Sequence, residues 1–340
     1  MTLFDTGMPS SVDEPRCVVF GEMLVDVFHD RLVPGGAPFN VAMHLAGLGL
    51  RPHLISRLGH DEEAQYLRVA AQRTGLSLAG LQLDRSRSTG RVEVVEDADG
   101  HHFRILQDQA YDHIDADGAC ASAARYVGGR STWLYSGTLV LRSPAPRASL
   151  TKLRASLAHR SYVDLNWRDA GTAPADALDA LRGTNVLKVS DEEQMQLLAW
   201  SDLPCVAGSG RPHLGERSTV LRTLLRGLGV EGLLVTHGAL GATAWNGDGE
   251  CIASSPAAPV ARLVDTVGAG DAFSAMALAQ LMLGLGVEEL LPRATAFAAS
   301  ICGLRGALPD EPGFYDRWRM DAPVPLADAP VAAALGSLER

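Results

Sequence analysis

The sequence has no closely spaced pair of cysteines. Its five cysteines are scattered singly along 340 residues, so neither a disulfide framework nor a zinc site is expected. It also lacks an excess of positive charge. The formal net charge is −10, which argues against nucleic acid or an anionic membrane surface as a standing partner. A small anion such as a nucleotide is not excluded, because a local cradle of N–H groups is enough to bind it.

Long apolar runs are absent as well. No stretch of about 18 consecutive apolar residues occurs, so we expect no transmembrane helix. Residues 1–15 lack the basic start and apolar run of a secretory signal. These absences predict a soluble, cytoplasmic protein. What the sequence does have is 46% hydrophobic residues, which can supply the core of a large α/β domain.

Short apolar runs alternate with helical patterns, which predicts an α/β fold with a mostly parallel sheet covered by helices. Six runs read as strands: Arg16–Phe20, Pro52–Leu58, Thr132–Tyr135, Tyr162–Leu165, Val186–Val189 and Gly232–Thr236. Each of the last four is followed by a helix candidate. Four further helical patterns are clear: Phe39–Gly49, Glu62–Thr74, Gly270–Leu285 and Glu288–Leu304.

Two pieces interrupt this alternation. Met23–His29 alternates apolar and polar residues, and Gly90–Glu96 and Gly100–Leu106 read as strands joined by an Asp-Ala-Asp-Gly turn, which is a hairpin signal. We interpret these pieces as a small β-sheet that projects from the main body, with strands from about 23–34 and 89–108. A surface hairpin without functional weight is the alternative.

The remaining segments set the expected limits of the domain. Ser201–Gly215 is rich in glycine and proline and should be a loop. The last twenty residues are rich in alanine and proline and should be loosely attached. We therefore expect one domain over 16–320, with 1–15 and 321–340 as terminal extensions.

The most informative segment is 265–271, DTVGAGD, which opens a helical pattern. Glycines at a helix start let the backbone approach a ligand and aim free N–H groups at an anion. A carboxylate there would repel a resting phosphate. Asp271 therefore indicates a general base that takes a proton from a hydroxyl while the cradle holds the transferring charge. The alternative is a turn whose Asp271 caps the helix, and this motif alone leaves both open.

A second glycine pair opens the first helix, in 35–42, GGAPFNVA. Asn40 offers both a donor and an acceptor, which suits a sugar hydroxyl. Asp26, in the alternating strand just upstream, can accept hydrogen bonds from two vicinal hydroxyls. The alternative is a helix start with Asn40 as its cap and Asp26 solvated.

Segments 35–42 and 265–271 together resemble the two signatures of the ribokinase-like (PfkB) carbohydrate kinase family. Four further family-like segments lie between them in order: 57–62 (RLGHDE), 164–168 (DLNWR), 188–193 (KVSDEE) and 236–241 (THGALG). The resemblance covers roughly residues 17–312. Six ordered matches are far more specific than one glycine motif and favour the kinase interpretation.

The resemblance implies a ribokinase-like three-layer α/β/α fold, with the small sheet as a lid over the sugar. It implies ATP as phosphoryl donor and Mg²⁺ to neutralise its charge. A lid that excludes water would stop ATP from being lost to hydrolysis. Exposed edges of the lid strands make a homodimer through the lid a reasonable expectation.

Roles in the reaction follow from the same resemblance. Asp271 matches the family's catalytic base, and the N–H groups around Gly268, Ala269 and Gly270 match its anion hole. The sugar-contacting positions of the family correspond to Asp26 and to three residues of the front segment: Gly35, Gly36 and Asn40.

The nucleotide and ion sites are implied in the same way. Thr236, Gly238 and Gly241 match the loop beside the ATP phosphates and ribose, and Glu193 matches an acidic position that organises magnesium through water. Asp265 and the backbone at Val267 fall where ribokinase-type enzymes bind a monovalent cation, here potassium, and the second half of such a site would come from Ile301–Gly306.

Two residues depart from the family pattern. Ser190 stands three residues before Glu193, where the family often has Asn, so magnesium–water organisation can differ in detail. His237 stands in the nucleotide loop, where small or apolar residues are common. It could donate to a phosphate, but a side chain directed to solvent is the interpretation we favour.

The choice of sugar rests on finer similarity. The Gly-Gly-Ala-Pro form of the front segment and the segments 164–168 and 188–193 resemble fructokinases, which implies conversion of fructose to fructose 6-phosphate. Arg168 could approach the transferred phosphoryl group, with Lys188 supporting the same region, and Arg104 in the lid could touch the sugar. The alternatives are a surface ion pair for Arg168, a strand end for Lys188 and a solvated strand position for Arg104.

Other functions stay open at this point. Ribose, 2-keto-3-deoxygluconate or a nucleoside could replace fructose as acceptor. A noncatalytic sugar-sensing module should have lost its base, whereas Asp271 is present. A nucleotide-binding oxidoreductase would need Gly-x-Gly-x-x-Gly after the first strand, and Gly21-Glu22-Met23 lacks it.

Overall fold

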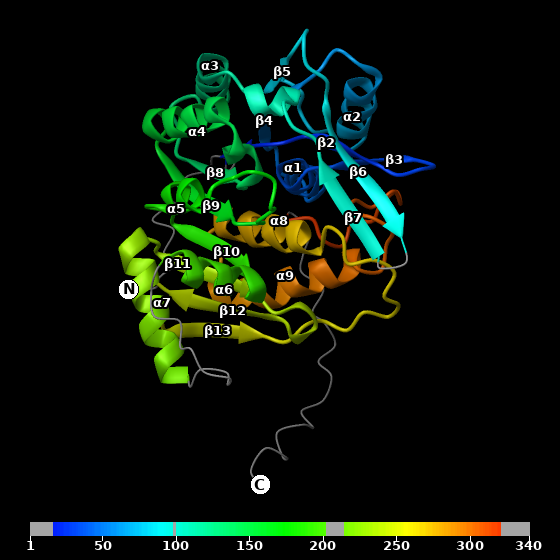
Figure 1. The fold of residues 1–340 in the computed structure, drawn as a ribbon. Helices are drawn as coiled ribbons and strands as arrows, with labels where there is room; N and C mark the ends of the chain where they lie inside the picture. Colours follow the sequence, from blue (N-terminus) through cyan, green and yellow to red (C-terminus); the bar gives the residue numbers. More distant parts are fainter. Residues whose placement is uncertain (1–15, 98–99, 202–213, 321–340) are drawn as a thin grey trace.

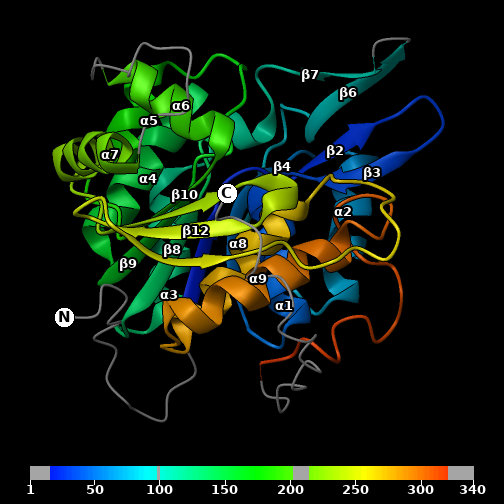
Figure 2. The same cartoon turned by 90° about the horizontal axis from the view of Figure 1, so that it is seen from below.

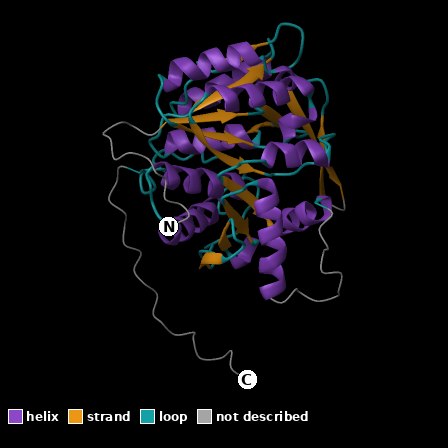
Figure 3. Cartoon of the chain, turned by 90° about the vertical axis from the view of Figure 1, so that its left-hand side faces the viewer, coloured by secondary structure: helices purple, strands orange, loops and turns teal. Residues whose placement is uncertain are grey.

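A computed structural model describes residues 16–97, 100–201 and 214–320. The expectations for 1–15, 321–340 and nearly all of Ser201–Gly215 lie outside the described residues. Within them, helices cover both faces of a central sheet, which gives three layers (Figure 3). In this part of the chain no helix is long and apolar enough to cross a membrane.

The central sheet is parallel over most of its width. Its strands in spatial order are β13 (Cys251–Ser255), β12 (Ala242–Asn246), β11 (Gly232–Thr236), β10 (Val186–Ser190), β9 (His159–Asp164), β8 (Thr132–Ser136), β1 (Arg16–Phe20), β4 (His53–Leu58) and β5 (Leu81–Leu83). From β11 to β5 all neighbours pair in parallel, and only β12 and β13 are antiparallel. The carboxyl ends of the parallel strands therefore meet at one edge, where open α/β sheets bind ligands.

All six predicted strands form, but one connection was predicted wrongly. Gly232–Thr236 leads into a short 3₁₀ turn, η3 (Gly238–Leu240), and then into the antiparallel pair β12–β13, and not into a helix. A turn beginning with Asn246 and Gly247 joins these two strands. Asn-Gly between apolar runs is a hairpin signal, so this pair was readable in the sequence and was missed.

Two groups of helices enclose the sheet. One face carries α1 (Ala37–Gly47), α2 (Glu62–Arg73), α8 (Ala269–Met282) and α9 (Val287–Ile301). The other carries α3 (Ala116–Val127), α4 (Pro144–Ser156), α5 (Pro174–Leu181), α6 (Asp191–Trp200) and α7 (Leu214–Leu228). Figure 2 shows α1, α8 and α9 grouped on one side of the sheet. The strands alternate accordingly: Cys17 and Val19 join the first core, whereas Val18 and Phe20 join the other.

Helix α8 is the central element of the first core. Every residue from Ala272 to Met282 is buried, and all but Ser274 and Gln280 are apolar, as expected for a helix enclosed by other elements. Its neighbours are α1 and α9 (Figure 1). Alanine at many of its positions lets these helices approach closely, which brings the first turns of α1 and α8 together.

The small sheet predicted to project from the body is present. It contains β3 (Leu32–Gly35), β2 (Leu24–Val27), β6 (Gly90–Asp97) and β7 (Gly100–Ile105) in that order. β2 pairs with β6 in parallel, and the other two pairs are antiparallel. Figure 1 shows this sheet extending from one end of the molecule. We call it the small sheet, and its action as a lid stays a prediction.

A buried ion pair fastens the segment after β7 to the main body. Asp112 lies in the 3₁₀ turn η1 (Ala110–His113) and Arg142 ends another, η2 (Leu139–Arg142). The two side chains are 2% and 1% exposed and lie 2.6 Å apart. Arg142 also donates to the carbonyl of Leu106, one residue beyond β7. Breaking this pair would leave an uncompensated charge in the interior.

We predict that Asp112→Ala lowers the free energy of unfolding by about 3–5 kcal/mol, because Arg142 loses its buried partner. Denaturant titration measures this change. The control is Asp179→Ala, which removes a pair with Arg182 whose side chains are 76% and 60% exposed. The control should change stability by less than about 1 kcal/mol. Equal small losses in both variants would contradict the assigned role of the buried pair.

Candidate active site

The second glycine segment begins α8 at the carboxyl edge of the sheet. Gly268 is its N-cap and has a φ of 79°, a conformation that favours glycine. A Cβ on Gly268 would lie 2.3 Å from the Cβ of Ala307, so a side chain cannot be added without displacing the neighbouring loop. The first N–H groups of an α-helix have no partner within the helix, and here that of Ala269 donates to Thr266 O at 3.3 Å.

Asp271 lies in this first turn and meets the front glycine segment. Asn40, in the first turn of α1, donates from Nδ2 to Asp271 Oδ2 at 2.8 Å, across 231 residues of sequence. The Asp271 side chain is partly exposed, so one side stays open to a substrate. The structure thus brings together the two residues on which the sequence argument depended most.

The surroundings of Asp271 tune its acidity. Burial is the largest influence and raises the pKa of Asp271 to about 6, opposed by the hydrogen bond from Asn40. The charge of Asp164 adds to the rise, while the cations Lys188 and Arg168 lower the pKa. A carboxylate with this pKa is ionised at neutral pH and still basic enough to accept a proton.

Lys188 lies directly beneath the glycine turn. It is 6% exposed, and its Nζ is 3.2 Å from the point that a Cβ on Gly270 would occupy. Burial alone would lower the pKa of Lys188, but the charges of Asp164 and other nearby carboxylates outweigh it and raise the pKa. Lys188 therefore stays charged beside the start of α8, where it can support a transferring anion.

A hydrogen-bond network fixes Lys188 in this position. Its Nζ lies 3.1 Å from Asp164 Oδ1, and Asp164 Oδ2 accepts from Ser274 Oγ of α8 at 2.7 Å. The hydroxyl of Tyr162 contacts Ser274 in turn, at 3.2 Å. The network links β9 and β10 to α8. Sequence analysis quoted Asp164 within a motif but gave it no role, because its partner on α8 lies 110 residues away.

Two carboxyl side chains lie against the front glycines. A Cβ on Gly35 would be 2.6 Å from Asp26 Oδ2, and a Cβ on Gly36, whose φ is 101°, would be 3.2 Å from Glu22 Cγ. Burial raises the pKa of Asp26 to about 6 and that of Glu22 to about 7. Gly35 therefore leaves room for the carboxyl of Asp26, and Gly36 leaves room for the backbone carbonyl of Glu22, whose oxygen lies 2.7 Å from the vacant Cβ position. Sequence analysis missed Glu22, although an acid directly after a buried strand end was a readable signal.

Arg168 is the cation shared by these carboxyls. It lowers the pKa of Asp26, of Glu22 and of Asp271. Its side chain is exposed, and its Nη1 donates to the carbonyl of Trp167 at 2.9 Å. Arg168 thus lies near enough to act on these carboxyls, and its approach to the transferred phosphoryl group stays a prediction.

Arg104 is not placed beside these groups. Its side chain is 75% exposed and pairs with Glu93 across the β6–β7 hairpin at 3.1 Å. This is the solvated strand position given as the alternative, and contact with a sugar stays a prediction for Arg104.

Glu193 forms a capping box at the start of α6. Its Oε2 accepts from Ser190 N at 2.7 Å, and Ser190 Oγ accepts from Glu193 N at 3.2 Å. Glu193 Oε1 accepts from Trp167 N at 2.7 Å. Ser190 therefore serves as a helix cap where the family often has Asn, and Glu193 is fixed in orientation.

The same arrangement fits an ion held through water. Each oxygen of Glu193 has a lone pair left over after its one backbone hydrogen bond. In the described part of the chain no three His, Cys, Asp or Glu side chains are grouped as a metal site. Mg²⁺ usually keeps several waters and binds through one or two carboxylates plus substrate phosphates, so Glu193 suits that mode.

His237 corrects an expectation. It does not point to solvent: its side chain is 14% exposed, and Nδ1 lies 2.7 Å from Asp191 Oδ1. Nε2 lies 2.8 Å from Thr243 Oγ1. Both ring nitrogens are therefore engaged, and His237 ties the start of α6 to β12.

The other residues of the nucleotide loop lie at the end of β11. Gly241 has a φ of 107°, and a Cβ there would meet the carbonyl oxygen of Ser255 at 2.1 Å, whereas Gly238 has a φ of 54° and open space around it. The close approach of β13 accounts for Gly241, and the open side at Gly238 is free for a ligand. Thr236 ends the strand, with its hydroxyl 3.4 Å from Val189 O.

Asp265 joins the two loops expected to form the monovalent-cation site. Its Oδ1 accepts from Val267 N and its Oδ2 from Gly306 N, both at 3.0 Å. The two loops are thus adjacent, as the sequence interpretation required, and potassium binding there stays a prediction.

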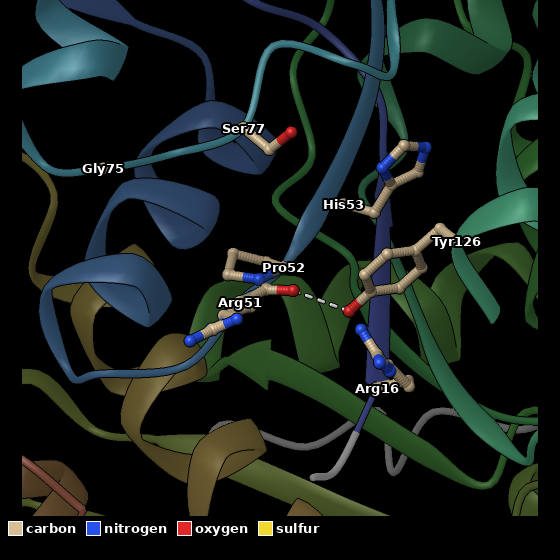
Figure 4. A pocket seen from close by; sticks show the side chains of 7 residues that line it. All are labelled: Arg16, Arg51, Pro52, His53, Gly75, Ser77 and Tyr126. Atoms are coloured by element: carbon tan, nitrogen blue, oxygen red, sulfur yellow. Dashed lines mark hydrogen bonds between the residues drawn. The ribbon is translucent and has the colours of Figure 1, made fainter.

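A cavity of about 400 Å³ lies at the opposite edge of the sheet (Figure 4). Its walls are Arg16, Arg51, Pro52, His53, Gly75, Ser77 and Tyr126. Arg16 and His53 begin β1 and β4, whereas Asp271 lies at the carboxyl edge. This cavity is therefore separate from the candidate active site.

Comparisons with known proteins show the family and the fold of this chain. The model of the pfkB family carbohydrate kinases matches residues 10–312. A fructokinase of Klebsiella pneumoniae is 30% identical over 305 residues, covering 84% of this chain and 91% of the relative. An aminoimidazole riboside kinase of Salmonella typhimurium is 29% identical over 269 residues, covering 75% and 77%. The structure of an ATP-bound fructokinase from Xylella fastidiosa has a TM-score of 0.72 at 20% identity, covering 86% and 93%.

We predict that Asn40→Ala raises the pKa of Asp271 above about 6. The lost N–H donor stabilised the carboxylate, so protonation should persist to higher pH. Titration of the Asp271 carboxyl carbon by NMR measures this shift. The control is Asn185→Ala, which removes a hydrogen bond to Glu231 outside the site and should leave the pKa of Asp271 unchanged. An unchanged pKa in Asn40→Ala would show that this contact does not tune the base.

Proposed function

Since the chain belongs to the pfkB family of carbohydrate kinases, we propose that it transfers the γ-phosphoryl group of ATP to a primary hydroxyl of a sugar, with fructose as the acceptor and fructose 6-phosphate as the product. The observation that carries this proposal is the Asn40–Asp271 hydrogen bond at the first turn of α8. It sets a partly exposed carboxylate beside the N–H groups of this turn and the ammonium of Lys188.

The proposed reaction assigns one task to each group. Asp271 accepts the proton of the sugar hydroxyl as its oxygen attacks the γ-phosphorus of ATP, and the bond from that phosphorus to the leaving ADP oxygen breaks. The N–H groups at Gly268, Ala269 and Gly270 hold the charge of the transferring group, and Lys188 adds a fixed positive charge beneath them.

Donor and ion would be held by the loops at the carboxyl edge. Thr236, Gly238 and Gly241 would lie along the ATP, in keeping with the ATP bound to the Xylella fructokinase. Glu193 would hold water of a Mg²⁺ ion, which supplies charge neutralisation on the phosphates. Asp265 and the backbone at Val267 would position carbonyl groups for potassium.

Fructose is favoured as acceptor by the Klebsiella relative and by the Gly-Gly-Ala-Pro form of the front segment. The riboside kinase at nearly the same identity makes a riboside the second candidate. We further propose 16–320 as the kinase domain, with the small sheet as its lid. A homodimer would form through the outer strands of that sheet, β3 and β7, which sedimentation would test.

The acceptor is tested with a panel of sugars in an ATP-coupled assay: fructose, ribose, 2-keto-3-deoxygluconate and aminoimidazole riboside. We expect the highest kcat/KM with fructose. A clear preference for any other acceptor would remove fructose from the proposal but leave the kinase mechanism standing. Running the panel with and without potassium tests the Asp265 site, which predicts faster turnover with the ion.

The mechanism is tested with Asp271→Asn. We expect kcat to fall by about 10²–10⁴-fold, the range for loss of a general base. Calorimetry should show that sugar and ATP still bind. The control is Asp248→Asn, which neutralises an exposed carboxylate paired with Arg226 and should keep kcat. Near-normal turnover in Asp271→Asn would overturn the assignment of the base.

A further inference from the structure

Glu22 is a buried acid that the mechanism above does not use. It follows Gly21 at the carboxyl end of β1 and is 2% exposed. Its Oε2 is buried and has no hydrogen-bond partner in the described part of the chain. A buried polar group without a partner is costly, so this oxygen calls for a partner that the described residues do not supply.

A second acceptor at the same site has the same deficit. Asn40 is 5% exposed. Its Nδ2 is committed to Asp271, and its Oδ1 is buried without a partner. Two neighbouring acceptors therefore both lack donors. A ligand rich in hydroxyl groups supplies such donors, whereas the phosphates of a nucleotide carry only acceptors.

Asp26 and Glu22 each lie against one glycine of the pair, Asp26 with its carboxyl group and Glu22 with its backbone carbonyl and Cγ. The missing side chain of Gly35 leaves room for the carboxyl of Asp26, and that of Gly36 leaves room for Glu22, whose Cγ and carbonyl oxygen lie 3.2 and 2.7 Å from the vacant Cβ position. Glu22 thus contacts Gly36, which is one residue nearer to Asn40 than Gly35, the glycine that Asp26 contacts. Asp26 is already a sugar-binding candidate, and the geometry extends the same role to its neighbour.

Charged groups around Glu22 come from several elements. Asp271 of α8 raises the pKa of Glu22, and Arg168 lowers it. The charge of Glu22 also contributes to raising the pKa of Arg142 and that of Tyr111, which lies beneath the small sheet. Arg142 is already paired with Asp112. Glu22 therefore shares its electrostatic surroundings with Asp271 and Arg168 on one side and with Arg142 and Tyr111 on the other.

We propose that Glu22 binds the sugar: its carboxyl accepts a hydrogen bond from a hydroxyl other than the one phosphorylated, on the Gly36 side of the site. This inference rests on the kinase assignment and not on the identity of the sugar. The rival role is structural, with a water bridging Glu22 to Nη1 of Arg142, which is also buried without a partner.

The test compares Glu22→Met and Glu22→Gln with the full-length wild-type enzyme. Met has similar length and needs no hydrogen bond. We expect Glu22→Met to raise the KM for D-fructose by about 10–100-fold, the range for a hydrogen bond to a charged group, with the KM for ATP within about twofold. Its melting temperature should equal or exceed that of wild type, because a well-packed apolar side chain replaces an unpaired buried acid. Glu22→Gln should raise the KM for fructose less.

Thr184→Val is the matched control. Thr184 is 0% exposed, and its hydroxyl is likewise buried without a partner, but it lies in the turn before β10, at the amino edge of the sheet. This variant should also keep or raise the melting temperature, and it should leave both KM values unchanged. It separates the effect of removing an unpartnered polar atom from the effect of removing a sugar contact.

Deoxy analogues of fructose identify the hydroxyl. The analogue that lacks the bound hydroxyl should bind wild type weakly, and it should bind wild type and Glu22→Met equally. The proposal is overturned if Glu22→Met and Glu22→Gln both keep the KM for fructose, or if Glu22→Met lowers the melting temperature without changing that KM, which is the result of the structural role. If the wild type rejects fructose, the proposed acceptor fails separately, and the same comparison is made with the best acceptor of the panel.

Discussion

The hydrogen bond between Asn40 and Asp271 is the contact on which the site depends. It joins the first turns of two helices, α1 and α8, that the chain reaches 231 residues apart. Each of these turns begins at a glycine with positive φ. The backbone thus places the two glycine segments, 35–42 and 265–271, face to face, and the side-chain amide of Asn40 holds the Asp271 carboxylate between them.

Charge balance around this contact comes from a few buried groups. Lys188 is kept ionised by Asp164, and Asp164 is held by Ser274 of α8. The exposed side chain of Arg168 lowers the pKa of three carboxyls, those of Glu22, Asp26 and Asp271. Removing a carboxyl from water raises its pKa, and a nearby cation opposes the rise. At neutral pH Asp271 and Asp26, each with a pKa of about 6, are therefore mostly ionised, whereas Glu22, with a pKa of about 7, is only partly ionised.

The fold could be predicted from the sequence, and so could the candidate site residues that lie within recognisable motifs. Asp271 and Asn40 were named from local patterns and Lys188 from the family resemblance, and the structure brings all three to one edge of the sheet. The small sheet was also predicted from alternation and a turn. The residues that were missed have partners far away in the sequence. Asp164 is bound by Ser274, which lies on a helix of another layer. Glu22 could be recognised as part of the site only from its contact with Gly36 in the folded chain. The predicted orientation of the His237 side chain toward solvent was wrong, because its hydrogen-bond partners come from α6 and β12, which are not adjacent to it in the sequence pattern.

The packing of α8 has a consequence for how such a protein can diverge. All eleven residues from Ala272 to Met282 are buried, and enlarging a side chain in a filled interior strains its surroundings. Drift in that helix is therefore confined to near-isosteric exchanges. Substitutions that change the substrate preference are therefore tolerated mainly in the peripheral strands and their connections. The reaction can then stay the same while the set of accepted substrates changes.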